Sequence, residues 1–309
     1  MKTASLCKPA LAGTARHATT GAAPARQPRA TARAAFARHA LAALLLAALP
    51  WAAQAHRTWL LPTATVVEGK DPVAVIDAAV SEDLFVFERA LQLDKLSAVG
   101  PKGETLAPEA VTTARHRSSF EVKLGEPGTY RIGNLSRQAM ASWKVGDETK
   151  RWRGKPEELA KAVPAGAQVL GVTVADNRLE TFVSRDEPGA SVPPAPADGI
   201  ALQPLDPVTD LSSGDSTRFV LLMDGKPLAD TVVTVLRGGN RYRYKLGELT
   251  LRTDARGQFT VAWPEPGQYW IGASWSAARP EGGAPGTGGT VEAPLRRAGY
   301  AATFEVLPR

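Results

Sequence analysis

The chain has 309 residues, a formal net charge of +6 and a single cysteine. Residues 1–55 hold seven Lys and Arg and no Asp or Glu, which leaves 30 of the 37 basic residues against all 31 acidic ones in 56–309. This overall balance gives no argument for binding to nucleic acid or to an anionic membrane. Because the cysteine is Cys7, residues 56–309 exclude a disulfide scaffold, a cysteine nucleophile and a thiolate metal site.

Residues 1–55 are predicted to be a cleaved secretory signal peptide. A basic region is followed by the apolar run ALAALLLAALP at 40–50 and by Ala53-Gln54-Ala55, a pattern that predicts cleavage after Ala55. The run is short for a bilayer span, and a retained anchor is the alternative. We therefore expect export to a periplasm, or alternatively to the cell exterior, of a mature chain without a transmembrane segment.

The mature chain contains a fourteen-residue pattern twice, as FEVKLGEPGTYRIG at 120–133 and FTVAWPEPGQYWIG at 259–272, with eight identities and no gap. Phe and Val alternate as on a strand, Glu-Pro-Gly predicts a turn, and Tyr and Ile alternate on a second strand. A tyrosine directly after such a turn is typical of the corner of an Ig-like sandwich. The repeat therefore indicates architecture, two sandwich corners, rather than two ligand sites.

The predicted fold is all-β, with two Ig-like or prealbumin-like β-sandwich domains. The first extends over 56–185 and the second over 200–309, joined by the Pro/Ala/Gly-rich linker 186–199. The strand-like sequence pattern is interrupted near 137–165. A segment that begins with proline at 156 predicts a short helix up to residue 163. We interpret this stretch as a helical insertion in the first domain.

Four segments, in this order, carry a family resemblance: AHRTWLLP at 55–62, IALQPL at 200–205, DGKPL at 224–228 and TFEV at 303–306. Together they resemble the domain-of-unknown-function family 4198, over roughly 56–307 of the chain. The resemblance implies a periplasmic, non-enzymatic accessory protein in transition-metal uptake, of nickel or cobalt type. Its implied partner is a metal transporter of the inner or outer membrane.

His56 is the first candidate metal ligand. The predicted cleavage makes it the N-terminal residue, whose α-amino group and imidazole both suit nickel or copper, and cobalt is a further candidate. The other histidine of the mature chain is His116, which lies between two arginines. Two interpretations stay open: a chelating pair of His56 and His116 with a carboxylate such as Glu68 or Asp77, or a terminal strand residue and a solvated loop histidine.

The tryptophans Trp263, Trp270 and Trp275 cluster around the second copy of the repeat. Exposed rings on a sandwich face could stack against sugars, whereas buried rings would pack a core. Alternation predicts that Trp270 faces opposite to Tyr269 and Ile271. The alternative function is thus an envelope binding or assembly module that recognises a glycan or a partner protein without metal.

The remaining motifs are weaker. Residues 237–245, RGGNRYRYK, interleave basic and aromatic residues as in nucleic-acid-binding segments, but near-zero net charge in an exported chain favours a solvated hairpin. No G-x-S-x-G motif or phosphate-binding loop occurs, and two histidines support no Ser-His-Asp arrangement. A copper oxidase would need a histidine brace. We therefore predict no enzymatic activity and no catalytic residue.

Overall fold

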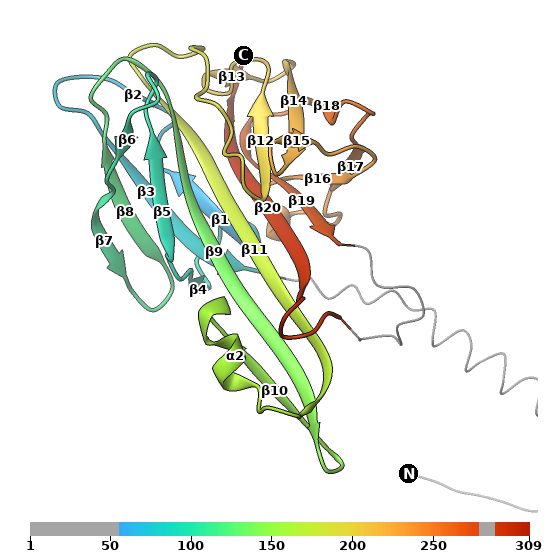
Figure 1. Cartoon of the computed structure of the whole chain (residues 1–309). Helices are drawn as coiled ribbons and strands as arrows, with labels where there is room; N and C mark the ends of the chain where they lie inside the picture. Colours follow the sequence, from blue (N-terminus) through green and yellow to red (C-terminus); the bar gives the residue numbers. More distant parts are fainter. Residues whose placement is uncertain (1–55, 278–287) are drawn as a thin grey trace, which may run out of the picture. The chain divides into compact units, whose positions relative to one another are not determined.

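The computed structural model describes residues 56–277 and 288–309 (Figure 1). The predicted signal peptide and its cleavage site lie outside these residues. The described chain is all-β with one short α-helix, as the sequence predicts. None of its helices has the length and apolar character needed to cross a membrane.

The described residues form three sheets. The five-stranded sheet has the order β1 (Arg57–Pro62), β3 (Val73–Ser81), β8 (Ser118–Lys123), β7 (Glu109–Thr113), with β4 (Arg89–Ala90) on β3. The four-stranded sheet has the order β12 (Ile200–Pro204), β14 (Ser216–Met223), β15 (Lys226–Pro227), with β18 (Gln258–Ala262) on β14.

The third sheet has eleven strands, and we call it the central sheet. Its order is β17 (Leu249–Arg252), β16 (Val232–Arg237), β19 (Gly267–Ser276), β20 (Leu295–Leu307), β11 (Gln168–Arg185), β9 (Gly128–Val145), β5 (Lys95–Val99), β6 (Thr105–Leu106). Three further strands join it: β10 (Glu148–Gly154) on β9, β13 (Leu211–Ser212) on β20, and β2 (Val66–Val67) on β11.

The five-stranded sheet packs on one face of the central sheet and the four-stranded sheet on the other. Because successive side chains of a strand point to opposite sides, one strand of the central sheet contributes to two cores. On β11, Leu179 and Val183 belong to the core shared with the five-stranded sheet, whereas Phe182 belongs to the core shared with the four-stranded sheet. On β20, Ala301 faces the first core and Tyr300 the second. Each core thus contains residues of both predicted halves, 56–185 and 200–309, and both halves contribute strands to one sheet.

Both copies of the repeat form a corner between two layers. The first copy leads from β8 of the five-stranded sheet into β9, and the second leads from β18 of the four-stranded sheet into β19. In each corner a tyrosine hydroxyl donates to the carbonyl four residues earlier: Tyr130 to Glu126 at 2.6 Å and Tyr269 to Glu265 at 2.7 Å. These bonds are the tyrosine-corner geometry that the repeat indicates.

A buried ion pair joins the central sheet to the segment 186–199, which the sequence predicts as a linker. Arg131 and Glu180, with side chains 3% and 2% exposed, meet at 2.7 Å. Arg131 also donates to the carbonyls of Leu202 (3.0 Å) and Pro193 (3.1 Å), and the Tyr300 hydroxyl donates to Glu180 at 2.7 Å. Besides each other, the two buried charges therefore have partners in three separate parts of the chain, as buried charges require.

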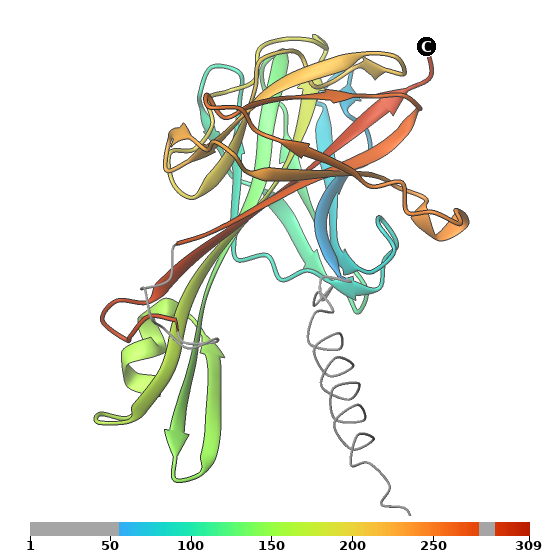
Figure 2. The same cartoon turned by 90° about the vertical axis from the view of Figure 1, so that its right-hand side faces the viewer.

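Beyond the layered body, β9 and β11 continue into an arm formed by residues 137–175 (Figures 1 and 2). The predicted helix is present here as the 3-10 turn η1 (Pro156–Glu158) and the helix α2 (Leu159–Ala162), while most of 137–154 is strand. Leu159 and Val163 pack with Trp143 and Val172 in a small core of the arm. The arm therefore has its own apolar packing on the face that carries α2.

Removing one partner of the buried pair should strongly destabilise the protein. Arg131→Met or Glu180→Gln is expected to lower the free energy of unfolding by about 3–5 kcal/mol, because each leaves a buried charge unpaired. The double variant should lose less than the sum of the two single losses. Urea unfolding measures all three; as control, Lys150→Met removes an exposed pair with Glu148 and should change little. Strictly additive losses would contradict the coupling.

Tyr300 should make stability fall at high pH. Burial, followed by the charge of Glu180, raises the pKa of Tyr300 well above its usual value. The folded state thus keeps the phenol protonated where the unfolded chain loses its proton, so this contribution is complete below about pH 10 and is lost at higher pH. In Tyr300→Phe the decline of unfolding free energy above pH 10 should be shallower by up to about 1.4 kcal/mol per pH unit. The exposed Tyr242→Phe should leave the slope unchanged.

Candidate functional site: the open face of the arm

The arm has one covered face and one open face. Its covered face carries α2 and the apolar side chains of Trp143, Trp152 and Val172. The strand register brings the intervening residues together on the other side: Ser142 lies between Arg151 of β10 and Gly171 of β11, and Met140 lies between Arg153 and Thr173. We call this second side the open face; its further rows hold Lys144, Thr149, Gln168, Gln138, Ala175 and Arg297.

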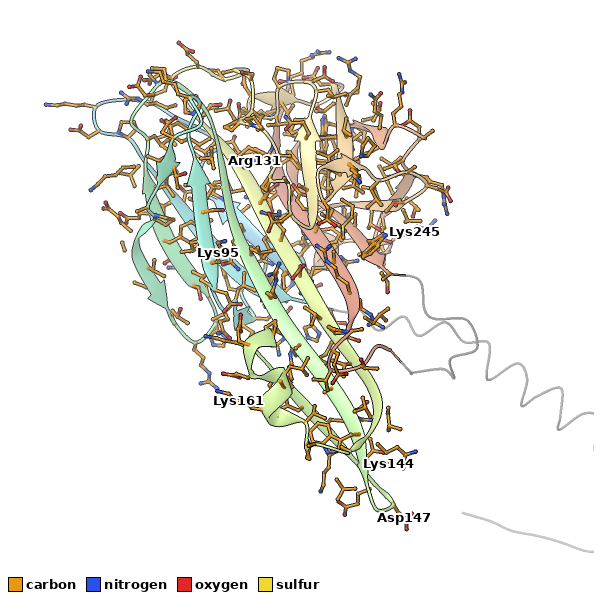
Figure 3. All side chains as sticks on the ribbon, in the orientation of Figure 1. Lys95, Arg131, Lys144, Asp147, Lys161 and Lys245 are labelled. Atoms are coloured by element: carbon orange, nitrogen blue, oxygen red, sulfur yellow. The ribbon has the colours of Figure 1, made fainter. Side chains whose placement is uncertain are left out.

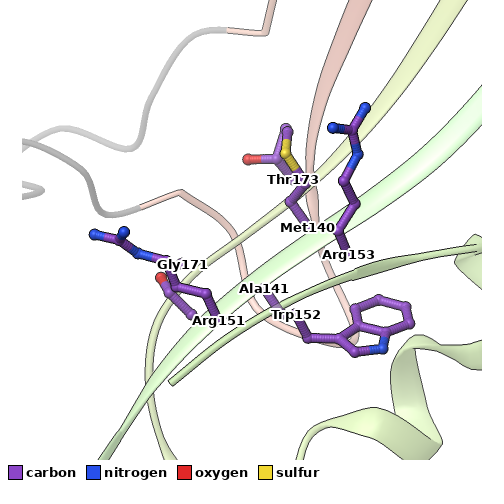
Figure 4. A pocket seen from close by; sticks show the side chains of 8 residues that line it. Met140, Ala141, Arg151, Trp152, Arg153, Gly171 and Thr173 are labelled. Carbon is purple, nitrogen blue, oxygen red and sulfur yellow. The ribbon is translucent and has the colours of Figure 1, made fainter. Parts of the chain in front are cut away.

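A groove of about 410 Å³ lies along the open face. Its lining combines apolar groups with hydroxyl and guanidinium groups from three strands: Met140, Ala141, Ser142, Arg151, Trp152, Arg153, Gly171 and Thr173. Figure 4 shows Met140, Arg153 and Thr173 gathered at one end, Arg151 beside Gly171, and Trp152 directed toward the helix. Met140 is 39% exposed, so its thioether forms part of the accessible lining.

All charged side chains of the open face are positive. They are Lys144, Arg151, Arg153 and Arg297, and the rows that surround them contain no Asp or Glu. Arg153 donates to the amide oxygen of Gln138, and Lys144 to the backbone carbonyl of Asp147 at 3.2 Å. None of the four forms an ion pair with any residue of 56–277 or 288–309. Among the described residues, therefore, no carboxylate competes for these four cations, and a carboxylate could bind them through charge-assisted hydrogen bonds.

The arm also has a free strand edge. β10 pairs with β9 on one side, and no described strand pairs with its other side. Lysine and arginine on an edge strand hinder uncontrolled strand pairing. The same edge remains able to accept an extended segment of opposite charge, whose backbone would extend the sheet.

The predicted ligand His116 is held in one tautomer. Its Nδ1 lies 2.8 Å from the Glu88 carbonyl, which can only accept, so Nδ1 carries the proton. The lone pair is then on Nε2, which belongs to an exposed side chain. A backbone carbonyl that fixes the second ring nitrogen is the usual arrangement of metal-binding histidines.

His56 and His116 lie near the same end of the five-stranded sheet but not side by side. His56 precedes β1, and His116 follows Arg115, whose carbonyl accepts from Ala90 of β4. Since β3 and β4 come between, about three interstrand spacings of about 4.8 Å separate the two backbones. In the described residues no three of His, Cys, Asp and Glu form a cluster that could hold a metal ion. The chelating pair stays a prediction.

The carboxylates named with this pair lie in different places. Glu68 is exposed in the loop that precedes β3. Asp77 is in the middle of β3 and lies 3.4 Å from Arg117. Burial raises the pKa of Asp77, and the charge of Arg117 partly opposes this. Asp77 is therefore engaged with an arginine rather than directed at a free cation site.

The three candidate tryptophans are packed to different degrees. Trp263 is 0% exposed and donates to the Thr217 hydroxyl at 2.8 Å. Trp270 faces opposite to its neighbours, as alternation predicts, but this side is covered: its indole packs on the core of the five-stranded sheet and donates to the Thr58 carbonyl at 3.1 Å. Trp275 is half-buried. The structure therefore does not bring the three rings together on an open surface.

Sequence reasoning missed the residues of the open face. Met140, Arg151 and Thr173 come from three strands, and only the register between these strands assembles them. One local signal existed: Arg151 and Arg153 flank a tryptophan at period two, which predicts a strand with one basic face.

Fold and site together define an all-β protein with a basic, grooved surface on a projecting arm. The family model described as "Domain of unknown function (DUF4198)" matches residues 53–277, and the chain belongs to this family. The resemblance found in the sequence is thereby confirmed.

A comparison with solved structures finds the "D0-D1 domain of Intimin", at 13% identity and a TM-score of 0.19, over 80% of this chain and 97% of that chain. This likeness is too low to inform fold or function. No curated protein matches the chain.

Proposed function

We propose that the protein is an exported, non-enzymatic binding protein that docks the open face of its arm on an acidic surface of a partner protein. One observation carries this proposal: Lys144, Arg151, Arg153 and Arg297 share one face with no acidic residue among them. Residues 56–309 hold 30 basic and 31 acidic residues, so this cluster is a local segregation of charge and not a consequence of a basic chain.

The chemistry of the groove suits carboxylates on a protein surface. An arginine can bind a carboxylate through two parallel hydrogen bonds, and Arg151 and Arg153 lie two residues apart on one strand. The exposed Met140, opposite Arg153 on the neighbouring strand β9, adds an adaptable apolar contact. Arginine and methionine are both enriched in protein interfaces, whereas a site for a free anion would not need the apolar part.

The resemblance to the family supports a more specific version of this proposal. The partner would be a membrane transporter for a transition metal, and the protein an accessory of that transporter in the periplasm. The docking role does not depend on this version. A partner of another kind with an acidic surface would use the same residues.

Reversing the charge of the groove should weaken binding of acidic chains. Poly-L-glutamate is the probe, and anisotropy of a fluorescent label on it reports binding. We expect Arg151→Glu/Arg153→Glu to weaken the affinity at least about tenfold, which corresponds to about 1.4 kcal/mol. Arg252→Glu/Arg256→Glu makes the same change of net charge at exposed positions outside the arm and should have a small effect. Equal losses in both variants would contradict the proposal.

Transition-metal binding is a second candidate, favoured by the geometry of His116. Its Nε2 can offer a lone pair to a metal, and His56 would add an imidazole and an amino group if cleavage follows Ala55. Because the described residues form no cluster of three ligands, we expect weak binding by few donors rather than a closed site.

Calorimetric titration of the exported protein with Ni²⁺ and Cu²⁺ separates the contributions of the two histidines. His56→Ala should remove most of the heat if the terminal residue chelates, and His116→Ala should remove less. Mass spectrometry of the N-terminus is done on the same sample. Titration curves that are identical in wild type and both variants would exclude these residues as ligands.

A further inference from the structure

The loop between β16 and β17 presents the most exposed aromatic side chains of the described chain. Tyr244 is fully exposed and Tyr242 is 83% exposed. Leu246, two residues further on, is 42% exposed. An apolar group in water is unfavourable, so three of them at the end of one loop indicate a surface that is covered in use.

The base of this loop is anchored. The Asn240 side chain accepts from the Leu84 backbone at 2.9 Å and donates to the Asp83 carboxylate at 3.3 Å. The Arg243 guanidinium donates to the carbonyl of Arg237 at 2.6 Å, and the 3-10 turn η2 (Asn240–Tyr242) shapes the loop. The tyrosines therefore project from a fixed support rather than from an unstructured segment.

Positive charge accompanies the tyrosines. Arg241 and Lys245 are exposed on either side of them, and residues 238–247 contain no Asp or Glu. The next acidic residue, Glu248, is paired with Arg57 at 2.9 Å. Arg241 lies 3.7 Å from the Asp83 carboxylate. Lys245 is thus the exposed cation of the loop tip that has no ion pair among the described residues, beside two aromatic rings and a leucine.

We propose that this loop docks on an anionic lipid bilayer. Tyrosine places an apolar ring at the level of the lipid headgroups while its hydroxyl stays in water, and Leu246 can enter the acyl boundary. Lys245 would be attracted to an anionic surface, whereas Arg241 is already paired with Asp83 at 3.7 Å. A nucleic acid would use the cations and rings but leave Leu246 in water, and a neutral glycan would not use the cations.

The proposed lipid contact is separate from the open face of the arm. The loop joins β16 to β17 at one side of the central sheet, whereas the arm is built on β9, β10 and β11. Figure 3 labels Lys245 on the layered body and Lys144 and Asp147 toward the end of the arm. The protein could therefore rest on a membrane through the loop while the arm remains free for a partner.

The test is flotation of the exported protein with vesicles of phosphatidylglycerol and phosphatidylcholine in equal parts. We expect wild type to float with these vesicles and not with pure phosphatidylcholine, and to be released by high salt. Tyr242→Ser/Tyr244→Ser should reduce the bound fraction at least about threefold, as loss of two ring contacts predicts. Both substitutions are on exposed side chains, and an unchanged near-UV circular dichroism spectrum verifies the fold.

Two controls make the outcome decisive. Arg151→Glu/Arg153→Glu should float like wild type, which separates a failure of the loop proposal from a failure of the arm proposal. Inorganic phosphate at the lipid phosphate concentration should not compete, because the apolar contact is missing. The lipid proposal is overturned if wild type stays unbound, if it binds both vesicle types equally, or if the tyrosine variant binds undiminished.

Discussion

The buried pair of Arg131 and Glu180 is the interaction on which the arrangement of layers depends. Both charges lie inside the protein, where an unpaired charge would be very unfavourable. Tyr300 donates a further hydrogen bond to Glu180, and Arg131 donates to the carbonyls of Pro193 and Leu202. Since these partners lie on β20, on segment 186–199 and on β12, the pair fixes how the four-stranded sheet covers the central one.

Arg178, two residues before Glu180 on β11, also binds backbone carbonyls near the start of β12. Its guanidinium donates to the carbonyl of Ile200 at 3.2 Å and to both the carbonyl and the carboxylate of Asp198 at 2.8 Å. Two arginines of the central sheet therefore hold the path by which the chain enters the four-stranded sheet. A stretch rich in proline and alanine has few side chains that could anchor it, so its position depends on its backbone carbonyls as acceptors.

Local sequence patterns predicted the turns and the side-chain orientations correctly, but no pattern predicted which distant strands pair. The corner around Tyr130 and Tyr269 depends on spacing within five residues, and the orientation of Trp270 follows from alternation alone. The shared central sheet depends on the pairing of Thr181 with Thr303, which no local pattern specifies. Contacts between layers are likewise long-range. The sequence therefore could not show that Trp270 packs against the five-stranded sheet, or that no described layer covers Tyr242 and Tyr244.

One face of the arm is open because the arm has a single short helix to pack against its strands. Its strands β10, β9 and β11 carry a single short helix, α2, which can bury only one side of the sheet. An antiparallel sheet with one solvated face is stable if that face is polar, and Ser142, Thr173 and the four cations satisfy this condition. A polar face needs no uniform sign, however, and mixed charges would stabilise it better through cross-strand pairs. The described part of the open face holds four positive charges without a negative one and so lacks those pairs, which supports the proposal that a partner with negative charges binds there.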